Sequence, residues 1–144
     1  MAGRPLPPPP APAGGYAPFV LRQDIGVVSG QFPIRDGALV FQGRIGAELT
    51  PAQGRRACEI AALNVLAQIH AATDGFASLD GLLRLDGHVA SADGFHAQPV
   101  ILDAASRVLT DRLGRRGAHA RTAFAPPRLP LDAPVELCAT FAVR

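Results

Sequence analysis

Short runs of apolar and β-branched residues, separated by turn-forming residues, open the folded part of the chain. Phe19-Val20-Leu21 and Ile25-Gly26-Val27-Val28 are joined through Arg22-Gln23-Asp24, a pattern that predicts a hairpin or two successive strands. The second strand should end within Ser29-Gly30-Gln31-Phe32-Pro33. Leu39-Val40-Phe41 predicts a third strand.

Two later segments carry apolar residues at helical spacing. Thr50-Pro51-Ala52-Gln53 combines an N-cap threonine, a proline at the first helical position and a glutamine three residues after the cap, so a helix should begin there. A second helix should run from Pro99 to Leu113 and stop at Gly114. The two apolar stripes are Cys58, Ala62, Val65, Leu66 and Ile69, and then Leu102, Ala105, Val108 and Leu109. Cys58 is therefore expected in the core rather than as a nucleophile.

Two stretches alternate with the period of a strand. Between Leu82 and Val89, the alternation predicts Leu83, Leu85, Gly87 and Val89 on one face and Leu82, Arg84, Asp86 and His88 on the other. Between Val135 and Val143, every second residue from Val135 is apolar, while Glu136 and Cys138 share the opposite face. The order of elements predicts an α+β fold with two helices on one face of a mixed sheet. Self-association is the economical way to cover the other face.

The length of 144 residues favours a single domain. Seven of the 14 prolines fall within residues 1–18, which predicts an extended arm packed on the surface, followed by one domain over residues 19–144. A role as a ligand for a polyproline-binding domain is the alternative for this arm. No segment has the apolar length of about 20 residues that a membrane span needs, and the N-terminus lacks the pattern of a secretory signal.

The chain contains no lysine, because all 14 basic residues are arginines. This composition excludes lysine Schiff bases, pyridoxal-phosphate enzymes and the lysine of a phosphate-binding loop. Cys58 and Cys138 have no CxxC partner, and the four histidines fit no metal-ligand spacing. We therefore expect no cofactor, no metal and two reduced thiols in a cytoplasmic protein.

The net charge of +2 is spread along the sequence. Only two pairs of arginines are adjacent, and one tyrosine and no tryptophan are present to stack on bases. We therefore expect no nucleic-acid partner.

Arg121 and Glu136 form the most informative pair for function. A guanidinium binds a carboxylate through two parallel hydrogen bonds, and a glutamate can move protons to and from a water molecule. Such a pair can hold a small acid and hydrolyse it. The alternative for Arg121 is a structural ion pair with Asp111, Asp132 or Glu136 itself.

Several stretches resemble the RidA/YjgF family of enamine and imine deaminases, which has a chorismate-mutase-like fold. The matching stretches are Pro18-Phe19-Val20, Val28-Ser29-Gly30-Gln31, Ala61-Ala62-Leu63-Asn64-Val65-Leu66, Ala120-Arg121-Thr122, Arg128-Leu129-Pro130 and Val135-Glu136-Leu137. The resemblance covers about residues 14–144 and, within the family, is greatest to a divergent subgroup with a longer loop over residues 114–119.

The resemblance implies a homotrimer with a cleft between each pair of neighbouring subunits. It assigns Arg121 to the substrate carboxylate and Glu136 to the attacking water, and it places Ser29 and Gly30 in the same cleft. Asp103 matches a family asparagine, with Pro99 as the alternative position.

Two positions depart from the family pattern. The pocket tyrosine of the family becomes Phe19 here, a position expected to line the substrate site, and the pocket cysteine becomes Ala123. Tyr16 lies three residues before Phe19 and can supply a hydroxyl instead.

Two functions follow as hypotheses. The first is hydrolysis of reactive 2-imino or enamino acids to 2-oxo acids and ammonia. The second, suggested by Phe19 and Ala123, is a trimeric module without catalytic activity that binds small carboxylates such as 2-oxo acids. A ribonuclease activity, attributed to some relatives, has no support in the sequence beyond a mildly basic pI of 8.9.

Overall fold

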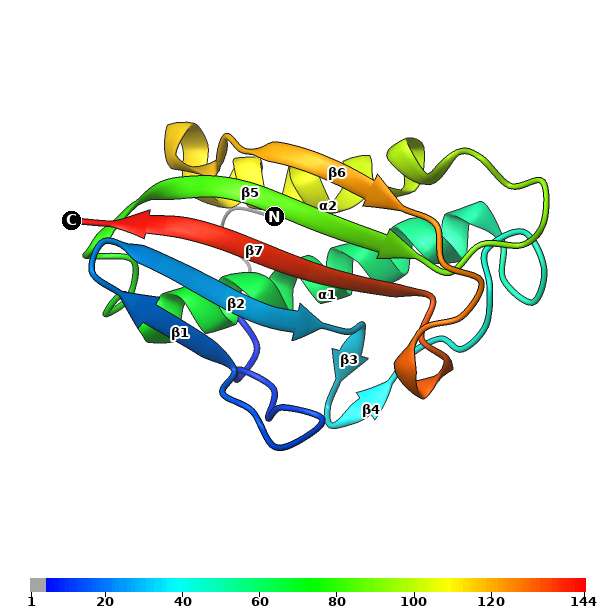
Figure 1. The fold of residues 1–144 in the computed structure, drawn as a ribbon, viewed down its shortest axis with the longest axis horizontal. Coiled ribbons are helices and arrows are strands. Elements are labelled where there is room, and N and C mark those ends of the chain that lie inside the picture. Colours follow the sequence, from blue (N-terminus) through cyan, green and yellow to red (C-terminus); the bar gives the residue numbers. More distant parts are fainter. Residues whose placement is uncertain (1–4) are drawn as a thin grey trace.

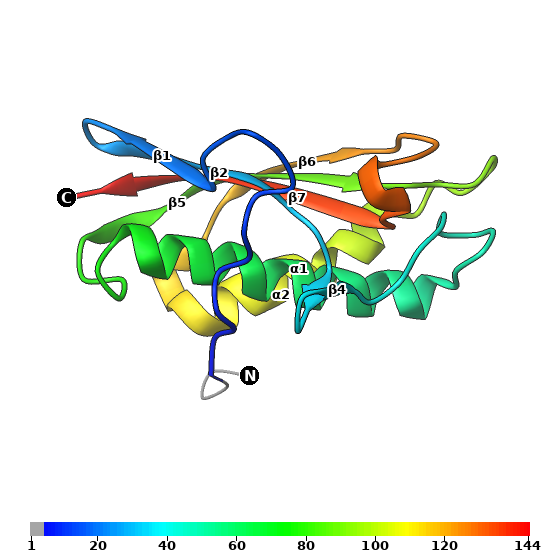
Figure 2. The ribbon, with the colours of Figure 1, turned by 90° about the horizontal axis from the view of Figure 1, so that it is seen from below.

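Five strands form one mixed sheet, and both long helices lie on the same face of it (Figure 1 and, from the edge, Figure 2). The computed structural model describes residues 5–144. Along the sheet the order is β1 (Phe19–Arg22), β2 (Ile25–Gln31), β7 (Val135–Val143), β5 (Leu79–Val89) and β6 (Ala120–Phe124). The helices are α1 (Pro51–Ala72) and α2 (Gln98–Leu113). The predicted α+β architecture is confirmed.

The capping box starts α1 as the sequence predicts. The backbone N–H of Gln53 donates to the Thr50 hydroxyl at 3.2 Å, and the Gln53 side chain accepts from the Thr50 backbone N–H at 2.9 Å. α2 ends at Gly114, whose φ of 60° is in the left-handed region that glycine adopts without strain. A short 3₁₀ helix, Gly114–Gly117, then leads to β6.

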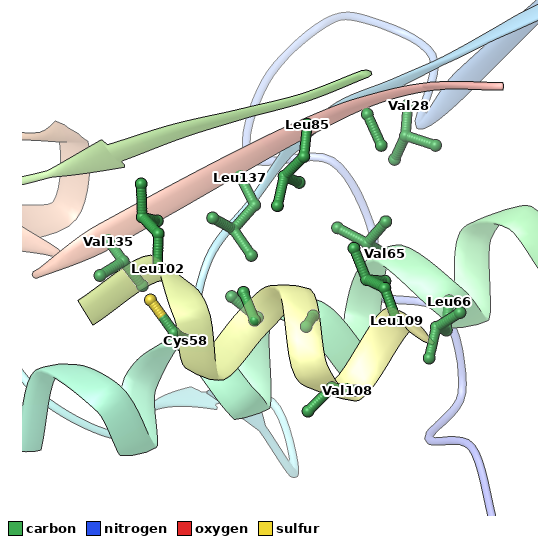
Figure 3. Close-up of a cluster of buried hydrophobic side chains, with 14 of the residues drawn as sticks. Val28, Cys58, Val65, Leu66, Leu85, Leu102, Val108, Leu109, Val135 and Leu137 are labelled. Carbon is green, nitrogen blue, oxygen red and sulfur yellow. The ribbon is translucent and has the colours of Figure 1, made fainter. Parts of the chain in front are cut away.

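The core lies between the sheet and the helices, and Figure 3 shows its central side chains. Both predicted helix stripes are buried there, and Cys58 is fully buried. Burial raises the pKa of the Cys58 thiol to about 12. Gly87 of β5 allows α2 to come close, because a Cβ at that position would overlap the Leu102 side chain. Cys58 is a packing residue, as predicted.

The predicted faces of β5 are wrong at its start. Leu82 is 7% exposed and Leu83 is 44% exposed, the reverse of the predicted alternation. A register shift causes this, since Leu82 pairs with Phe141 and Arg84 with the adjacent Thr140. Leu83 is the extra residue of a bulge, which moves the following side chains to the other face.

The predicted third strand at residues 39–41 is also wrong. A small separate hairpin forms instead from β3 (Ile34–Arg35) and β4 (Ala38–Leu39). Asp36 and Gly37 both have positive φ, 54° and 79°, so a tight Asp-Gly turn fixes the hairpin before Val40. Val40 and Phe41 lie outside the strands.

The sequence pattern did not predict β6. This edge strand runs parallel to β5 and pairs Leu85 with Arg121. Its residues are exposed or partly buried, so they carry no apolar alternation. A second 3₁₀ helix, Pro130–Asp132, precedes β7.

The proline-rich arm contains no helix or strand over residues 5–12. Leu6 packs against the core, and the Pro10 carbonyl accepts a hydrogen bond of 2.9 Å from the Gln68 side chain of α1. Residues 1–4 of the predicted arm lie outside the described residues. The division at residue 18 stays a prediction. Within the described part of the chain, no helix is both long enough and apolar enough to cross a membrane.

Candidate functional site

Arg121 projects from the edge strand toward α2. Its register partner Leu85 is fully buried on the helix side of the sheet, so the Arg121 side chain lies on that side too. Nη1 donates to Asp103 Oδ1 and to Ser106 Oγ, each at 3.0 Å, and Nη2 donates to the Pro99 carbonyl at 3.3 Å. Asp103 and Pro99, the two candidates for the family asparagine position, therefore both contact Arg121. None of the expected ion-pair partners, Asp111, Asp132 or Glu136, forms the pair.

Ser106 belongs to a hydrogen-bonded chain that holds Arg121. His119 Nδ1 lies 2.7 Å from the Gly117 carbonyl, which can only accept, so Nδ1 carries the proton. His119 Nε2 then accepts from the Ser106 hydroxyl at 2.9 Å, and the Ser106 oxygen accepts from Arg121. With this tautomer, each hydrogen bond from Gly117 to Arg121 has one donor and one acceptor.

The contacts leave part of the Arg121 guanidinium available. Of its five N–H groups, two on Nη1 and one on Nη2 are used. Nε–H and one Nη2–H have no acceptor among residues 5–144, and the side chain is 22% exposed. Two N–H groups on neighbouring nitrogens can bind the two oxygens of a carboxylate.

Glu136 lies on the face of the sheet that no helix covers. It pairs in register with His88 of β5, and the His88 ring donates from Nδ1 to the Glu136 backbone carbonyl at 3.1 Å. The His88 ring stacks on Phe124 of β6, with ring centres 4.8 Å apart. Burial raises the pKa of the half-buried Glu136 carboxyl above its ordinary value, and the positive charge of His88 opposes that rise. Glu136 therefore holds a proton more readily than an exposed glutamate does.

Gly30 lies directly beneath the Glu136 carboxylate. A Cβ on Gly30 would overlap Oε2 and lie 2.7 Å from Cδ of Glu136, so no other residue fits without a shift. The pairing of β2 with β7 is irregular between Val28 and Gln31, which places this glycine in a bulge. Ser29 in the same bulge donates its hydroxyl to the Ala17 carbonyl at 2.6 Å. Gly30 therefore contacts Glu136, and Ser29 is its neighbour in the bulge.

Phe19 lies elsewhere. Its register partner is the buried Val28, so the Phe19 ring is on the helix side of the sheet, opposite Glu136. Tyr16, which is exposed, lines a small pocket with Ser29 and Gly30, and its hydroxyl accepts a 3.3 Å hydrogen bond from the Ala13 backbone. Tyr16 therefore lies beside Ser29 and Gly30, whereas Phe19 is on the opposite face of the sheet.

Within one chain, the two halves of the expected site are separate. Arg121 and Asp103 lie on the helix side at the β6 edge, whereas Glu136, Gly30 and Ser29 lie on the bare side, with β5 between β6 and β7. A cavity of about 440 Å³ lies between α1 and α2; Asp103 lines it and Glu136 does not. A single subunit does not place Arg121 and Glu136 around one ligand.

Side chains that could bind a metal do not gather in the described part of the chain. No three of its histidine, cysteine, aspartate and glutamate side chains lie close enough to hold an ion. Cys138 shares the bare face with Glu136, and burial together with the Glu136 and Asp86 carboxylates raises the pKa of its thiol to about 11. Cys138 is therefore protonated at neutral pH and is a weak nucleophile.

Comparison with known proteins identifies the fold. The sequence pattern described as "YjgF/chorismate_mutase-like, putative endoribonuclease" matches residues 1–143. The chain belongs to this family. Its sheet, covered by two helices on one face, is the YjgF/RidA fold.

Individual YjgF-family relatives match over most of their length. Protein TCP17 of Trypanosoma cruzi is 33% identical over 92% of this chain and 83% of its own. A protein named a putative endoribonuclease from Shewanella oneidensis is 32% identical, with a TM-score of 0.93 over 98% of this chain and 93% of that one. Protein Atu1372 of Agrobacterium tumefaciens is 35% identical, with a TM-score of 0.86 over 89% and 82%.

Escherichia coli TdcF, determined with bound serine, shares the YjgF fold. It is 19% identical to this chain, with a TM-score of 0.69 over 94% of this chain and 92% of TdcF.

Sequence reasoning missed two residues of the Arg121 group. The sequence pattern assigns no role in the site to Ser106 or to His119. Ser106 lies four residues after Leu102 and one after Ala105, both in the apolar stripe of α2, and this helical spacing is the signal that could have placed it near the sheet edge.

Proposed function

We propose that this YjgF-family protein hydrolyses reactive 2-imino acids, or their enamine tautomers, to 2-oxo acids and ammonia. The observation that carries this proposal is the Arg121 guanidinium, held by three acceptors and left with two N–H groups for a carboxylate. Serine, the molecule bound in the TdcF structure, has such a carboxylate.

Glu136 is the group that moves protons in this proposal. Water attacks C2 of the protonated imine and gives a proton to the Glu136 carboxylate, while the C=N electron pair moves onto nitrogen. Glu136 then protonates that nitrogen, the new hydroxyl returns a proton to Glu136, the C–N bond breaks and a carbonyl forms. Ammonia leaves as the C–N bond breaks and takes that proton from Glu136, so the carboxylate is regenerated and the products are the 2-oxo acid and ammonium. A carboxyl with a raised pKa suits this exchange, and such general acid–base catalysis contributes about 10²–10⁴-fold.

The proposal requires a second subunit. Arg121 is at one edge of the sheet and Glu136 is on its bare face, so they meet only if the β6 edge of one subunit packs beside the Glu136 face of its neighbour. Two different surfaces that meet head to tail can close into a ring of subunits. We propose a homotrimer with three such clefts.

Replacing Arg121 with alanine tests whether this residue binds the substrate carboxylate. The R121A variant should lose the acceleration of 2-imino acid decay in a coupled imine-clearing assay. Arg107→Ala is the matched control, because Arg107 is an exposed arginine on α2 with no contact to Arg121. Turnover by R121A at the wild-type rate would refute the assignment.

A binding module without catalytic activity is the second candidate. Phe19 faces the helix side, and Ala123, two residues after Arg121, is an exposed alanine with no reactive group. The imine-clearing assay, together with a binding measurement, separates the deaminase from the binding module. If the wild-type protein binds 2-oxobutanoate and leaves the decay of the imine unchanged, the module is the better assignment.

A further inference from the structure

A chain of buried side-chain amides links the proline-rich arm, which runs past α1 to the sheet (Figure 2), with β2. The Gln68 amide nitrogen of α1 donates to the Pro10 carbonyl of the arm at 2.9 Å and to Gln31 Oε1 of β2 at 3.4 Å. The Gln31 amide nitrogen in turn donates to the Ser29 carbonyl at 3.0 Å. Gln68 is 1% exposed and Gln31 is 6% exposed. Both amide orientations are fixed, because the Pro10 and Ser29 carbonyls can only accept.

The arm also contacts the bulge of β2 directly. The hydroxyl and the backbone N–H of Ser29 donate to the carbonyls of Ala17 and Pro18, at 2.6 Å and 2.9 Å respectively. Arm residues and Gly30 line a cavity of only about 20 Å³, which is room for about one water molecule. Little open space therefore remains between the bulge and residues 10–18 of the arm.

The bulge determines how the Glu136 carboxylate is held. Gly30 lies beneath this carboxylate so closely that a Cβ would lie 2.7 Å from Glu136 Cδ. A shift of the bulge therefore changes how much of the carboxyl is buried. Within the described part of the chain, the ionisable side chains beside Glu136 are His88 of β5 and Cys138 of β7. Residues 5–18 contain no side chain that is charged at neutral pH, so the arm acts on Glu136 through packing and not through a charge.

We propose that the proline-rich arm is a strap that holds the β2 bulge in place and thereby positions Glu136. Gln68 and Gln31 are the positioning residues that join the arm to the bulge from inside the molecule, and Ser29 joins them at the surface. Loss of the Gln68 amide leaves buried acceptors without a donor, so the arm and the bulge separate. The inference goes beyond the proposed function, because it concerns how Glu136 is held and not the reaction that Glu136 assists.

Gln68→Met tests the strap in the full-length protein. Methionine is an unbranched side chain of similar length that donates no hydrogen bond. NMR should show a loss of the heteronuclear NOE at Ala11 of the arm, a changed amide shift of Gly30, and a pKa of the Glu136 carboxyl that falls toward its ordinary value. Gln31→Met breaks the middle of the chain, so it should lower the pKa of Glu136 while Ala11 stays ordered.

Gln98→Met is the matched control. Gln98 is also buried, and its amide nitrogen also donates two hydrogen bonds, to the Ser91 hydroxyl at 3.0 Å and to the Phe95 carbonyl at 2.7 Å. Its substitution removes the same kind of buried hydrogen bonds without touching the arm. Q98M should therefore leave the NOE of Ala11 and the pKa of Glu136 unchanged.

Ser29→Ala is an independent variant, because it breaks the surface link without altering the core. It should lower the pKa of Glu136 even where Q68M fails to fold. The proposal is overturned if the pKa of Glu136 is unchanged in Q68M or in S29A, if Ala11 stays ordered in Q68M, or if Q98M lowers that pKa as much as Q68M does. These measurements use no turnover, so a failure of the strap is distinguished from a failure of the deaminase assignment.

Discussion

At the scale of single residues, His119 controls how Arg121 is held. The imidazole makes two hydrogen bonds that lie on opposite sides of the ring, one to the Gly117 carbonyl and one from the Ser106 hydroxyl. Substituting His119 with asparagine or with glutamine tests these two hydrogen bonds separately. Asparagine places its amide near the position of Nδ1, and glutamine places its amide near the position of Nε2.

His119→Asn should therefore weaken ligand binding more than His119→Gln does. H119N keeps a donor for Gly117 and removes the acceptor for Ser106, whereas H119Q keeps that acceptor. We expect the KM for a 2-imino acid to rise about fivefold in H119N, the equivalent of one net hydrogen bond, with a smaller rise in H119Q and little change in kcat for either. Steady-state kinetics of both variants measures this. Equal changes in KM would mean that His119 acts only as a packing residue.

At the scale of elements, the capping box in the first turn stabilises α1. The Thr50 hydroxyl satisfies an N–H group that the helix itself leaves without a partner. Thr50→Ala should lower the free energy of unfolding by about 1 kcal/mol. Denaturant unfolding measures the change. Thr110→Ala is the control, because its exposed hydroxyl bonds to the Arg107 carbonyl of its own helix and caps nothing. If T110A costs as much as T50A, the capping box is not what stabilises the start of α1.

The helices could be predicted because their signals are local. A capping box, a 3.6-residue stripe and a terminal glycine lie within the segments that they organise. The hairpin of β1 with β2 could be predicted from its short apolar runs, and β7 could be predicted from its alternation. The bulge at Leu83 was not, because a bulge is defined by the pairing with β7 and not by the sequence of β5.

The candidate site was predictable in part for the same reason. Alternation along β7 placed Glu136 on the bare face, and the structure confirms that face. Local patterns did not predict the neighbours of Arg121: only the family resemblance pointed to Asp103, and nothing pointed to Ser106. Asp103 and Ser106 precede Arg121 by 18 and 15 residues and reach it only when α2 packs on the sheet. Such contacts come from tertiary packing, which local periodicity does not encode.

At the scale of the whole molecule, the face of the sheet that no helix covers exposes several apolar side chains. Exposed apolar side chains lie on it beside the polar residues around Glu136: Val20, Ile25, Val27 and Phe124. Apolar residues that share one open sheet face are typical of a surface that another subunit covers. For the proposed homotrimer, light scattering should give three times the chain mass of 15.0 kDa.

Mixed assemblies can test whether two subunits share each site. R121A and Glu136→Gln should each be inactive alone. In a ring, an intact site needs Arg121 from one subunit and Glu136 from its neighbour, so co-refolding the two variants in equal amounts should restore about a quarter of the sites. The imine-clearing rate measures this recovery, and brief mixing of the two folded variants, without subunit exchange, is the control. Mixed trimers that remain inactive would mean that Arg121 and Glu136 do not meet across an interface, and that the reaction does not use them together.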